Sequence, residues 1–343
     1  MNPKPYWILR HHGSSSIRSL HYAHNLLAVG DEAGSVSLVD LVTLRPKFHW
    51  TAHEDSILTV IVVDAGQVIT HARDNTLKLW SLPPSTRSIG TTTSGNGGGD
   101  SAIQPHLIRT IPVNALNFAR CSHLSHNLAL PNVLDAAYID IISLRTGLRL
   151  HEAIGRPNIT SSTPPKRLPI VMSLHLLPDS TVIAGYEDGF IKKWRLESGE
   201  LIWTARCHSE SVMSLSVARG FGVSVAADDR IARFDLTSGA TQLTQTKLPG
   251  NASTAIAPDE KSFAVGAWNG SINVYSTSHS PAHLGTLNYH RDTVECLTFA
   301  HVKVSEKDVQ DDSSDEDDDD TQDAQLVLAA GGRDGKISLW KYH

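Results

Sequence analysis

The sequence has few cysteines and no long apolar run. Among its 343 residues, the three cysteines are Cys121, Cys207 and Cys296, and no two of them form a CxxC pair. This spacing argues against a zinc site or a disulfide and predicts buried free thiols in a reducing compartment. The longest apolar run, near Val60–Val63, is far too short to span a membrane. The N-terminus MNPKPYWILRHHG lacks the apolar stretch of a signal peptide, so we expect an intracellular protein.

Motifs of several enzyme classes are also missing. The chain has no P-loop, no GxSxG, no HExxH and no GxGxxG after a strand. Its 18 histidines are spread along the chain, and none pairs with a cysteine at metal-ligand spacing. Basic pairs such as Lys166-Arg167 form no stripe of the kind that binds nucleic acids. We therefore expect no catalytic, cofactor-binding or metal-binding residues, no enzyme activity, and no direct binding to nucleic acid or membrane.

Negative charge is concentrated in one segment. The chain has a formal net charge of −6, but residues 305–323 alone contain eleven acidic residues and one lysine. That segment has a charge of −10, and subtracting −10 from −6 leaves +4 for the rest of the chain. The sequence predicts a mildly basic folded protein with one acidic insertion. The insertion is either a solvated loop or a contact for a basic partner.

One strand pattern is present seven times. The segment TLKLWSL (76–82) alternates apolar and polar residues, as a half-buried β-strand does. Most copies follow a short turn rich in Gly, Asp or Asn, and three of the six spacings between copies are 40 or 41 residues. This period is typical of WD repeats, and it predicts one all-β domain over 1–343, a seven-bladed WD-repeat β-propeller. The other copies are SVSLVDL (35–41), YIDIISL (138–144), FIKKWRL (190–196), RIARFDL (230–236), SINVYST (271–277) and KISLWKY (336–342).

The two ends of the chain are expected to complete one blade together. The C-terminal residues Trp340–His343 stop one strand short of a four-stranded blade. Near the N-terminus, YWILRHH (6–12) resembles the outer strand and following His of FHWTAH (48–53). We predict that residues 6–10 pair with the last blade and close the ring, which leaves no open sheet edge there.

Three flexible insertions are predicted between strands. Residues 83–104 in blade two are rich in Gly, Ser and Thr, as flexible linkers are. Residues 156–167 join blades three and four, and residues 305–323 form the acidic insertion of blade seven.

The stretch ITHARDNTLKLWSL places a His, an Arg and an Asp ahead of a Trp, which invites an acid–base interpretation. Its recurrence in several blades favours a structural one. In a WD repeat, the Asp of the turn orients a His from the preceding loop, and this His reaches a hydroxyl next to the Trp. Blade two offers His53, Asp74, Thr70 and Trp80 for such a network, which would satisfy buried polar groups.

The other blades are expected to depart from this network. Blade seven has Ala330 where the hydroxyl would stand, and blade one has Ala33 and Val39 at the Asp and Trp positions. We expect His71 and Arg73 of blade two to be exposed turn residues, which the fold does not require.

Candidate binding residues are those turn residues that the fold does not need. Trp268 stands in the GAWNG turn of blade six, where Gly and Asn would suffice. Equivalent turns carry Tyr186 and Glu187 in blade four, Arg73 in blade two and Arg333 in blade seven. Trp, Tyr and Arg are enriched among binding hot spots. These five residues are predicted to ring one mouth of the central channel, either as a partner-binding surface or as ordinary surface residues.

Beyond generic WD repeats, eight segments between residues 27 and 341 resemble the ASTRA-associated protein 1 family, whose animal relative is guanine nucleotide-binding protein beta-subunit-like protein 1. The segments ITHARD and VNALNF are more specific than any WD dipeptide. The Gly-rich and acidic insertions differ from the family in length and composition. The resembling segments are LAVGDEAG (27–34), AHEDSIL (52–58), ITHARDN (69–75), VNALNF (113–118), LPNVLD (130–135), AGYEDG (184–189), HSESVMSL (208–215) and GGRDGKISLWK (331–341).

The resemblance implies a non-catalytic scaffold subunit of the ASTRA complex, a nuclear assembly associated with chromatin remodelling and with maturation of phosphatidylinositol-3-kinase-related kinases. The implied partners are the TTT cochaperone, the RuvB-like ATPases and kinase-like client proteins. One alternative stays open for a propeller of this kind, a WD-repeat peptide reader such as a histone-tail receptor or a ubiquitin-ligase substrate receptor. A hydrolase would need convergent carboxylates or a metal near the channel, and the inner strands supply neither.

Overall fold

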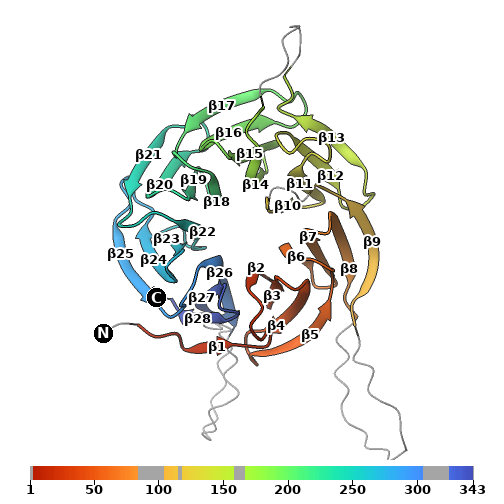
Figure 1. The fold of residues 1–343 in the computed structure, drawn as a ribbon, viewed down its shortest axis with the longest axis vertical. Helices are drawn as coiled ribbons and strands as arrows, with labels where there is room; N and C mark the ends of the chain where they lie inside the picture. Colours follow the sequence, from red (N-terminus) through yellow and green to blue (C-terminus); the bar gives the residue numbers. More distant parts are fainter. Residues whose placement is uncertain (1–2, 84–103, 115–117, 158–166, 304–323, 343) are drawn as a thin grey trace, which may run out of the picture.

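The computed structural model describes residues 3–83, 104–114, 118–157, 167–303 and 324–342. In these ranges every regular secondary-structure element is a β-strand. No helix among them is long and apolar enough to cross a membrane. The strands form seven antiparallel sheets of four strands each, which stand as blades around a central opening (Figure 1). The protein is therefore a seven-bladed β-propeller, as the repeated strand pattern predicts. The predicted insertions at 83–104, 156–167 and 305–323 lie, except for their end residues, outside the described residues.

Each blade runs from an inner strand to an outer strand (Figure 1). The strands of the first three blades are β2 (Ile17–Ala23), β3 (Leu26–Asp31), β4 (Ser35–Asp40) and β5 (Arg45–Thr51) in blade one; β6 (Ile57–Asp64), β7 (Gln67–Ala72), β8 (Thr76–Ser81) and β9 (His106–Pro112) in blade two; and β10 (Ser122–Leu124), β11 (Asn127–Pro131), β12 (Ile139–Ser143) and β13 (Arg149–Ile154) in blade three.

The next three blades repeat this arrangement. Their strands are β14 (Val171–Leu177), β15 (Thr181–Tyr186), β16 (Phe190–Arg195) and β17 (Leu201–Arg206) in blade four; β18 (Val212–Val217), β19 (Phe221–Ala226), β20 (Arg230–Asp235) and β21 (Thr241–Gln245) in blade five; and β22 (Asn251–Ile256), β23 (Ser262–Ala267), β24 (Ser271–Ser276) and β25 (His283–Asn288) in blade six.

Both ends of the chain contribute to blade seven. Its inner strands are β26 (Val294–Lys303), β27 (Ala324–Gly332) and β28 (Ile337–Lys341), and its outer strand is β1 (Trp7–Leu9). Trp7 lies opposite Leu339 and Leu9 opposite Ile337 in antiparallel register. The predicted closure of the ring by the N-terminal strand is thus confirmed, and the end of the chain gains its fourth strand.

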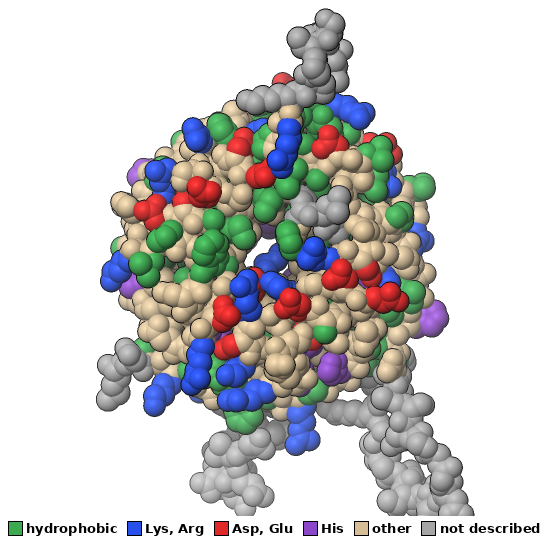
Figure 2. Space-filling model, in the orientation of Figure 1, with side chains coloured by type: hydrophobic (Ala, Val, Ile, Leu, Met, Phe, Trp, Pro, Cys, Tyr) green, Lys and Arg blue, Asp and Glu red, His purple; other side chains and the backbone are tan. Residues whose placement is uncertain are grey.

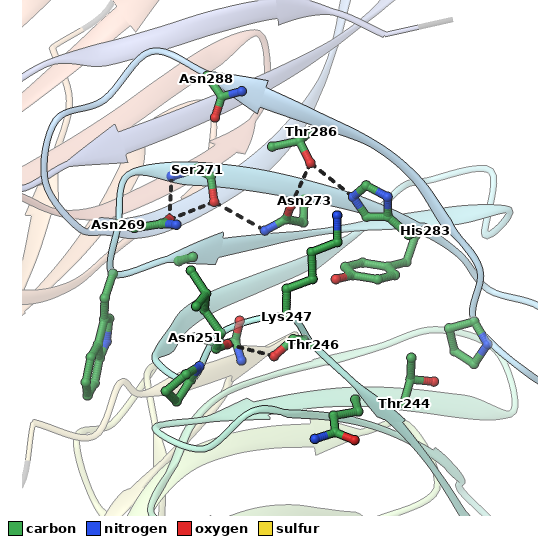
Figure 3. Close-up of a pocket in the computed structure, with 17 residues that line it drawn as sticks. Thr244, Thr246, Lys247, Asn251, Asn269, Ser271, Asn273, His283, Thr286 and Asn288 are labelled. Carbon is green, nitrogen blue, oxygen red and sulfur yellow. Dashed lines mark hydrogen bonds between the residues drawn. The ribbon is translucent and has the colours of Figure 1, made fainter.

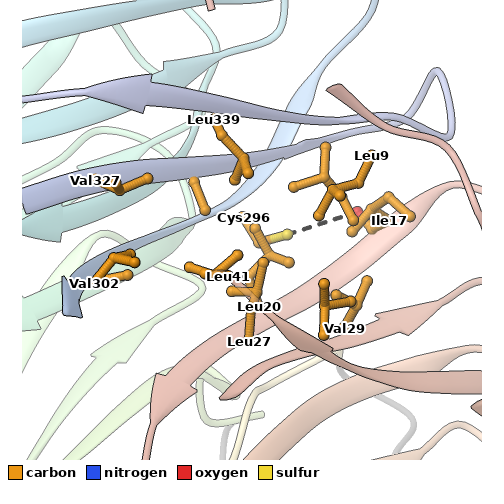
Figure 4. Close-up of a cluster of buried hydrophobic side chains, with 14 residues drawn as sticks. Leu9, Ile17, Leu20, Leu27, Val29, Leu41, Cys296, Val302, Val327 and Leu339 are labelled. Carbon is orange, nitrogen blue, oxygen red and sulfur yellow. Dashed lines mark hydrogen bonds between the residues drawn. The ribbon is translucent and has the colours of Figure 1, made fainter. Parts of the chain in front are cut away.

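Buried apolar side chains fill each interface between neighbouring blades. Figure 4 shows the cluster between blades seven and one, in which Leu9 and Leu339 pack with Ile17 and the Cys296 thiol. Each fully buried side chain of this size contributes about 1.5–3 kcal/mol relative to exposure. Cys121 and Cys207, like Cys296, are buried free thiols, as predicted. Burial raises the pKa of the Cys296 thiol to about 12, so it remains protonated.

Close contact between blades explains one recurring glycine. A Cβ added to Gly30, the fifth residue of β3, would lie 2.4 Å from Ile57 Cγ2 of the next blade. Gly185 and Gly266 hold the equivalent strand position, opposite the isoleucine of the third strand. Blade two has His71 there, opposite Leu77. The prediction that His71 is an exposed turn residue is wrong: it is a strand residue, 0% exposed.

Candidate partner-binding surface

The turn of blade two is held by a chain of hydrogen bonds. His53 Nδ1 lies 2.8 Å from Asp74 Oδ2, and because a carboxylate only accepts, Nδ1 is the donor. Nε2 then accepts from the Thr70 hydroxyl at 2.7 Å, and Trp80 Nε1 donates to the same Thr70 oxygen at 2.8 Å. Both nitrogens of the ring are engaged within the fold. Hydrogen bonds therefore connect the four residues predicted for this network. The network holds the turn of blade two and does not leave His53 and Asp74 as a free acid–base pair.

The pKa values of this pair suit a structural role. Burial lowers the pKa of His53 more than Asp74 raises it, so the ring is neutral at pH 7. Burial raises the pKa of Asp74, but hydrogen bonds from Thr76 and His53 outweigh it and hold that pKa below its usual value. A neutral imidazole beside an ionised carboxylate keeps both groups satisfied without moving a proton.

Blade one contains the same kind of network, which differs from the sequence-based expectation. His12 Nδ1 donates to Asp31 Oδ2 at 2.7 Å, and His12 Nε2 lies 2.8 Å from Ser37 Oγ. Asp31 stands two residues before Ala33, at the end of β3, and it also accepts from the backbone N–H of Ala33 and Ser35. The Asp31 carboxylate, two residues before the position where an Asp was expected, therefore orients the turn of blade one.

Blade seven obtains its hydroxyl from a different strand. His290 Nδ1 donates to Asp334 Oδ1 at 3.0 Å, and His290 Nε2 lies 2.8 Å from Ser338 Oγ. Trp340 Nε1 donates to the same oxygen at 2.9 Å. Ser338 lies opposite Ala330 in the sheet, which explains how the network survives an alanine at the predicted position.

Blade five has a network that the sequence reasoning missed. His208 Nδ1 donates to Asp228 Oδ1 at 3.1 Å, and His208 Nε2 lies 2.8 Å from Ser224 Oγ. Its His stands four residues before the inner strand and its Asp two residues before the third strand, as in blade two. That spacing was the signal from which it could have been found.

Arg333 of blade seven lies within a cluster of charged residues that the sequence analysis did not predict. Arg333 Nη2 lies 2.8 Å from Glu295 Oε1, and Arg18 Nη1 lies 3.2 Å from the same oxygen. Arg18 also pairs with Glu32 at 3.1 Å. Arg120 of blade three donates to the backbone oxygens of Arg18 and Glu295 at 2.9 and 2.7 Å. These five residues, here the arginine cluster, join blades one, three and seven.

The arginine cluster presents a fixed charged surface. It contains three guanidinium groups and two carboxylates, so its formal charge is +1. Arg333 and Glu32 are about half exposed, whereas Glu295 is mostly covered. Exposed ion pairs contribute little to stability, but these pairs fix the positions of the Arg18 and Arg333 guanidinium groups. Sequence reasoning found Arg333 from its turn and missed the others, because Arg18, Arg120 and Glu295 are brought together from distant blades.

Arg73 of blade two lies against an aromatic ring. Its guanidinium carbon is 4.5 Å from the centroid of the Phe118 ring, a cation–π distance. Phe118 is 58% exposed and has a left-handed φ of 50°, an uncommon conformation for an aromatic residue. Arg73 and Phe118 therefore form an exposed pair with one charged and one apolar component, which suits a protein contact.

The two predicted residues of blade four differ in exposure. Glu187 receives two hydrogen bonds of 3.1 Å from Arg167 Nη2, one to each carboxylate oxygen, and both side chains reach solvent. Tyr186 is only 2% exposed. Its hydroxyl accepts a hydrogen bond from Trp194 Nε1 at 2.9 Å, and burial raises its pKa. The prediction of Tyr186 as a contact residue is thus corrected, since Tyr186 is the last residue of β15 and supports the blade.

Trp268 of blade six is exposed, in agreement with its predicted place in a turn. Its side chain is 48% exposed, and its backbone N–H donates to Gly250 O at 2.9 Å. A Cβ on Gly250, whose φ is +92°, would lie 2.5 Å from the indole ring. Because Gly250 has no side chain, the loop before blade six can pass directly beneath the indole ring of Trp268. This contact fixes the position of the ring.

Comparison with curated proteins places the sequence in a family. ASTRA-associated protein 1 of Penicillium rubens is 30% identical over an alignment that covers 98% of this chain and 96% of that protein. The protein of the same name from Verticillium alfalfae is 30% identical, with 98% and 92% covered. This chain belongs to the ASTRA-associated protein 1 family. A more distant member, from Schizosaccharomyces pombe, is 26% identical over 99% of both chains.

Comparison with solved structures agrees with the fold. The crystal structure of the computationally designed Ika8 protein matches with a TM-score of 0.60 and covers 99% of this chain and 98% of that one. At 15% sequence identity this likeness shows the fold alone. No family model matches the sequence.

The face of this family member shown in Figure 2 is chemically uneven around the central opening. Basic and acidic side chains gather beside the opening over the sheets of β2–β5 and β26–β28, and hydrophobic side chains gather on the side of β18 and β22. Among the described residues, no group of three or more His, Cys, Asp or Glu could hold a metal ion. This face therefore carries fixed charges on one side of the opening and apolar side chains on the other.

Proposed function

We propose that this chain is a non-catalytic scaffold subunit of an ASTRA complex. The observation that carries the proposal is near-full-length similarity to proteins named ASTRA-associated protein 1, at 25–30% identity across several fungi. A rigid ring of blades with exposed charged and aromatic turns supports it, because propellers position partner contacts on loops held by stable strands.

The finer parts of the proposal follow the resemblance described above. As an ASTRA subunit, the chain contributes to chromatin remodelling and to the assembly or maturation of phosphatidylinositol-3-kinase-related kinases in the nucleus. Its partners are the TTT cochaperone, the RuvB-like ATPases and kinase-like clients. Glu187, Arg73, Arg333 and Trp268 are proposed as contact residues.

Affinity purification of the tagged full chain, followed by mass spectrometry, tests this proposal. Recovery of TTT subunits and RuvB-like ATPases is the expected result. Recovery of a cullin adaptor or of histones in their place would support a substrate receptor or a peptide reader and contradict the scaffold proposal. Fractionation of cells tests the nuclear location in the same material.

A double variant tests the contact residues. Trp268→Ala with Arg73→Ala is expected to melt at the wild-type temperature and to reduce recovery of the cochaperone more than tenfold, which corresponds to about 1.4 kcal/mol. The matched control is Leu284→Ala with Arg219→Ala, which also removes an exposed apolar side chain and an exposed arginine, but away from these turns. Equal recovery by both double variants would rule out Trp268 and Arg73 as contacts.

A further inference from the structure

A groove of about 650 Å³ lies between blades five and six (Figure 3). One wall is formed by β21 and the loop that follows it, and the other by β24 and β25. Pockets that hold small ligands or short peptide segments have volumes of about 300–1,000 Å³. The groove is therefore large enough to bind several residues of another chain.

The groove lies where other blades hold a buried histidine. His53, His208 and His290 each stand four residues before the inner strand of their blade, and their side chains are fully buried. In blade six the residue four positions before the inner strand is Lys247. Lys247 is exposed, and in Figure 3 its ammonium end points to the side of Asn273. The imidazole that fills this space in blades two, five and seven is thus missing in blade six.

The partners of that histidine are also replaced in blade six. The residue two positions before the third strand is Asp74 in blade two and Asn269 in blade six. Asn273 takes the sheet position that Ser338 has in blade seven, opposite Val265. Blade six has therefore exchanged a His–Asp–Ser arrangement for Lys, Asn and Asn, and space opens between them.

The polar side chains of the groove are held in fixed orientations. Ser271 Oγ donates to Asn269 Oδ1 at 2.7 Å, and Asn273 Nδ2 donates to Ser271 Oγ at 3.3 Å. Thr286 Oγ1 donates to Asn273 Oδ1 at 2.8 Å (Figure 3). This chain orients the Asn273 amide so that its nitrogen, which carries two hydrogens, has a second donor for a ligand.

The charge of the groove favours an anion. None of the described residues that line it is acidic, and across the described ranges no ion pair or hydrogen bond involves the Lys247 ammonium. The mouth of the groove is apolar, because Trp268 and Leu248 are 48% and 59% exposed. A ligand that satisfies both features carries a negative group next to an apolar one.

We propose that this groove binds an extended peptide segment of a partner protein. The segment places an Asp or Glu carboxylate beside Lys247 and Asn273, and an apolar side chain against Trp268 and Leu248. A carboxylate suits the site better than a phosphate, because phosphopeptide sites use clusters of Arg and the described lining residues include one Lys and no Arg. The inference rests on the proposed scaffold function, to which it adds a class of partner segment.

Oriented pentapeptide libraries test the class of ligand. Three libraries are random except at the central residue, which is Asp, Asn or phosphoserine, and binding to the full chain is measured by fluorescence anisotropy. The Asp-centred library is expected to bind at least tenfold more tightly than the Asn-centred one. Equal binding of these two libraries, or tenfold tighter binding of the phosphoserine library, overturns the proposal.

Variants of the chain test the site. Lys247→Ala is expected to weaken binding of the Asp-centred library at least tenfold, whereas Lys261→Ala removes an exposed lysine of the same blade outside the groove and leaves binding unchanged. The triple variant Lys247→His, Asn269→Asp, Asn273→Ser rebuilds the arrangement of blade seven. It is expected to lose binding and keep its melting temperature. Should the triple variant not fold, Lys247→Ala still decides, because tight binding by it contradicts the proposal.

Affinity purification of wild type and Lys247→Ala separates this inference from the proposed function. If wild type and Lys247→Ala recover ASTRA subunits equally, the proposed peptide binding in the groove is wrong and the proposed scaffold function is supported. If wild type recovers no ASTRA subunit but binds the Asp-centred library through Lys247, the scaffold function is wrong and the groove stands.

Discussion

Blades two and six have the same strands and equivalent pairings, with Thr70 opposite Lys78 in one and Val265 opposite Asn273 in the other. They differ in the polar side chains packed against those strands. Blade two encloses His53 in a hydrogen-bonded network, whereas blade six carries an exposed Lys247 and an open groove. The blade therefore forms without the network, and its absence leaves polar side chains available for a ligand.

Apolar packing explains why blade six tolerates this loss. Phe263 and Tyr275 stack with ring centroids 5.5 Å apart and an interplanar angle of 18°, and they pack with Val265 and Ile231 of blade five. In blade two the corresponding aromatic residue is Trp80, which packs against Trp50 and also donates to Thr70. Apolar contact thus stabilises both blades, and the hydrogen bonds add to one of them.

Removal of the aromatic residue of blade two should have the largest effect. Trp80→Ala is expected to lower the free energy of unfolding by about 3–5 kcal/mol, because it leaves a cavity and removes the indole N–H that donates to Thr70. Urea denaturation measures this loss. The matched change Tyr275→Phe in blade six keeps the ring and should cost less than about 1 kcal/mol. A loss below that value for Trp80→Ala would show that the network blade does not depend on its Trp.

Removal of the histidine of the network should have a smaller effect. His53→Ala removes one hydrogen-bond partner from Asp74 and one from Thr70. Hydrogen bonds to charged groups contribute about 1.5–3 kcal/mol. We expect the free energy of unfolding to fall by about 2–3 kcal/mol in chemical denaturation. If His53→Ala unfolds at the same denaturant concentration as wild type, the network does not stabilise blade two as argued.

Acid should destabilise blade two through His71, whose counterpart in blade six is Gly266. Burial lowers the pKa of His71 from 6.5 to about 4. Between these values the unfolded chain binds a proton that the folded protein does not, so stability falls as pH falls. The loss from this group is about 2 kcal/mol between pH 6.5 and pH 5.

The variant His71→Val isolates this effect, since blade five has Val225 at the equivalent position. Its free energy of unfolding should depend less steeply on pH between 6.5 and 5 than that of wild type. Parallel pH profiles of the two proteins would show that His71 does not titrate as argued.

Removal of Lys247 from blade six should have the smallest effect on stability. Its side chain is exposed, and surface substitutions away from special contacts change the free energy of unfolding by less than about 0.5 kcal/mol. Thermal denaturation of Lys247→Ala is expected to overlay that of wild type. A loss as large as that of His53→Ala would mean that Lys247 supports the blade in place of the histidine.

The repeat by itself determined the fold of this protein. Seven copies of one alternating strand, with three of the six spacings at 40 or 41 residues, specify four-stranded blades. Period two buries one face of each strand, and short turns keep neighbouring strands paired. Residues 6–12 resemble an outer strand, and Trp7–Leu9 among them pair with β28. The network of His53, Asp74, Thr70 and Trp80 could also be read from spacing, since these residues come from one blade and its preceding loop.

Only the tertiary structure decided which residues meet across blades and which are covered. Arg18 of β2, Glu295 of β26 and Arg120, which precedes β10, come from three blades and meet because the ring brings them together. Tyr186 and His71 stand next to turns in the sequence, but the strand register places them inside. Blade six opens a groove because Lys247 does not fill the space that a buried histidine fills in blades two, five and seven. Burial and distance depend on neighbours far away in the chain, and a repeat pattern describes only neighbours within one blade.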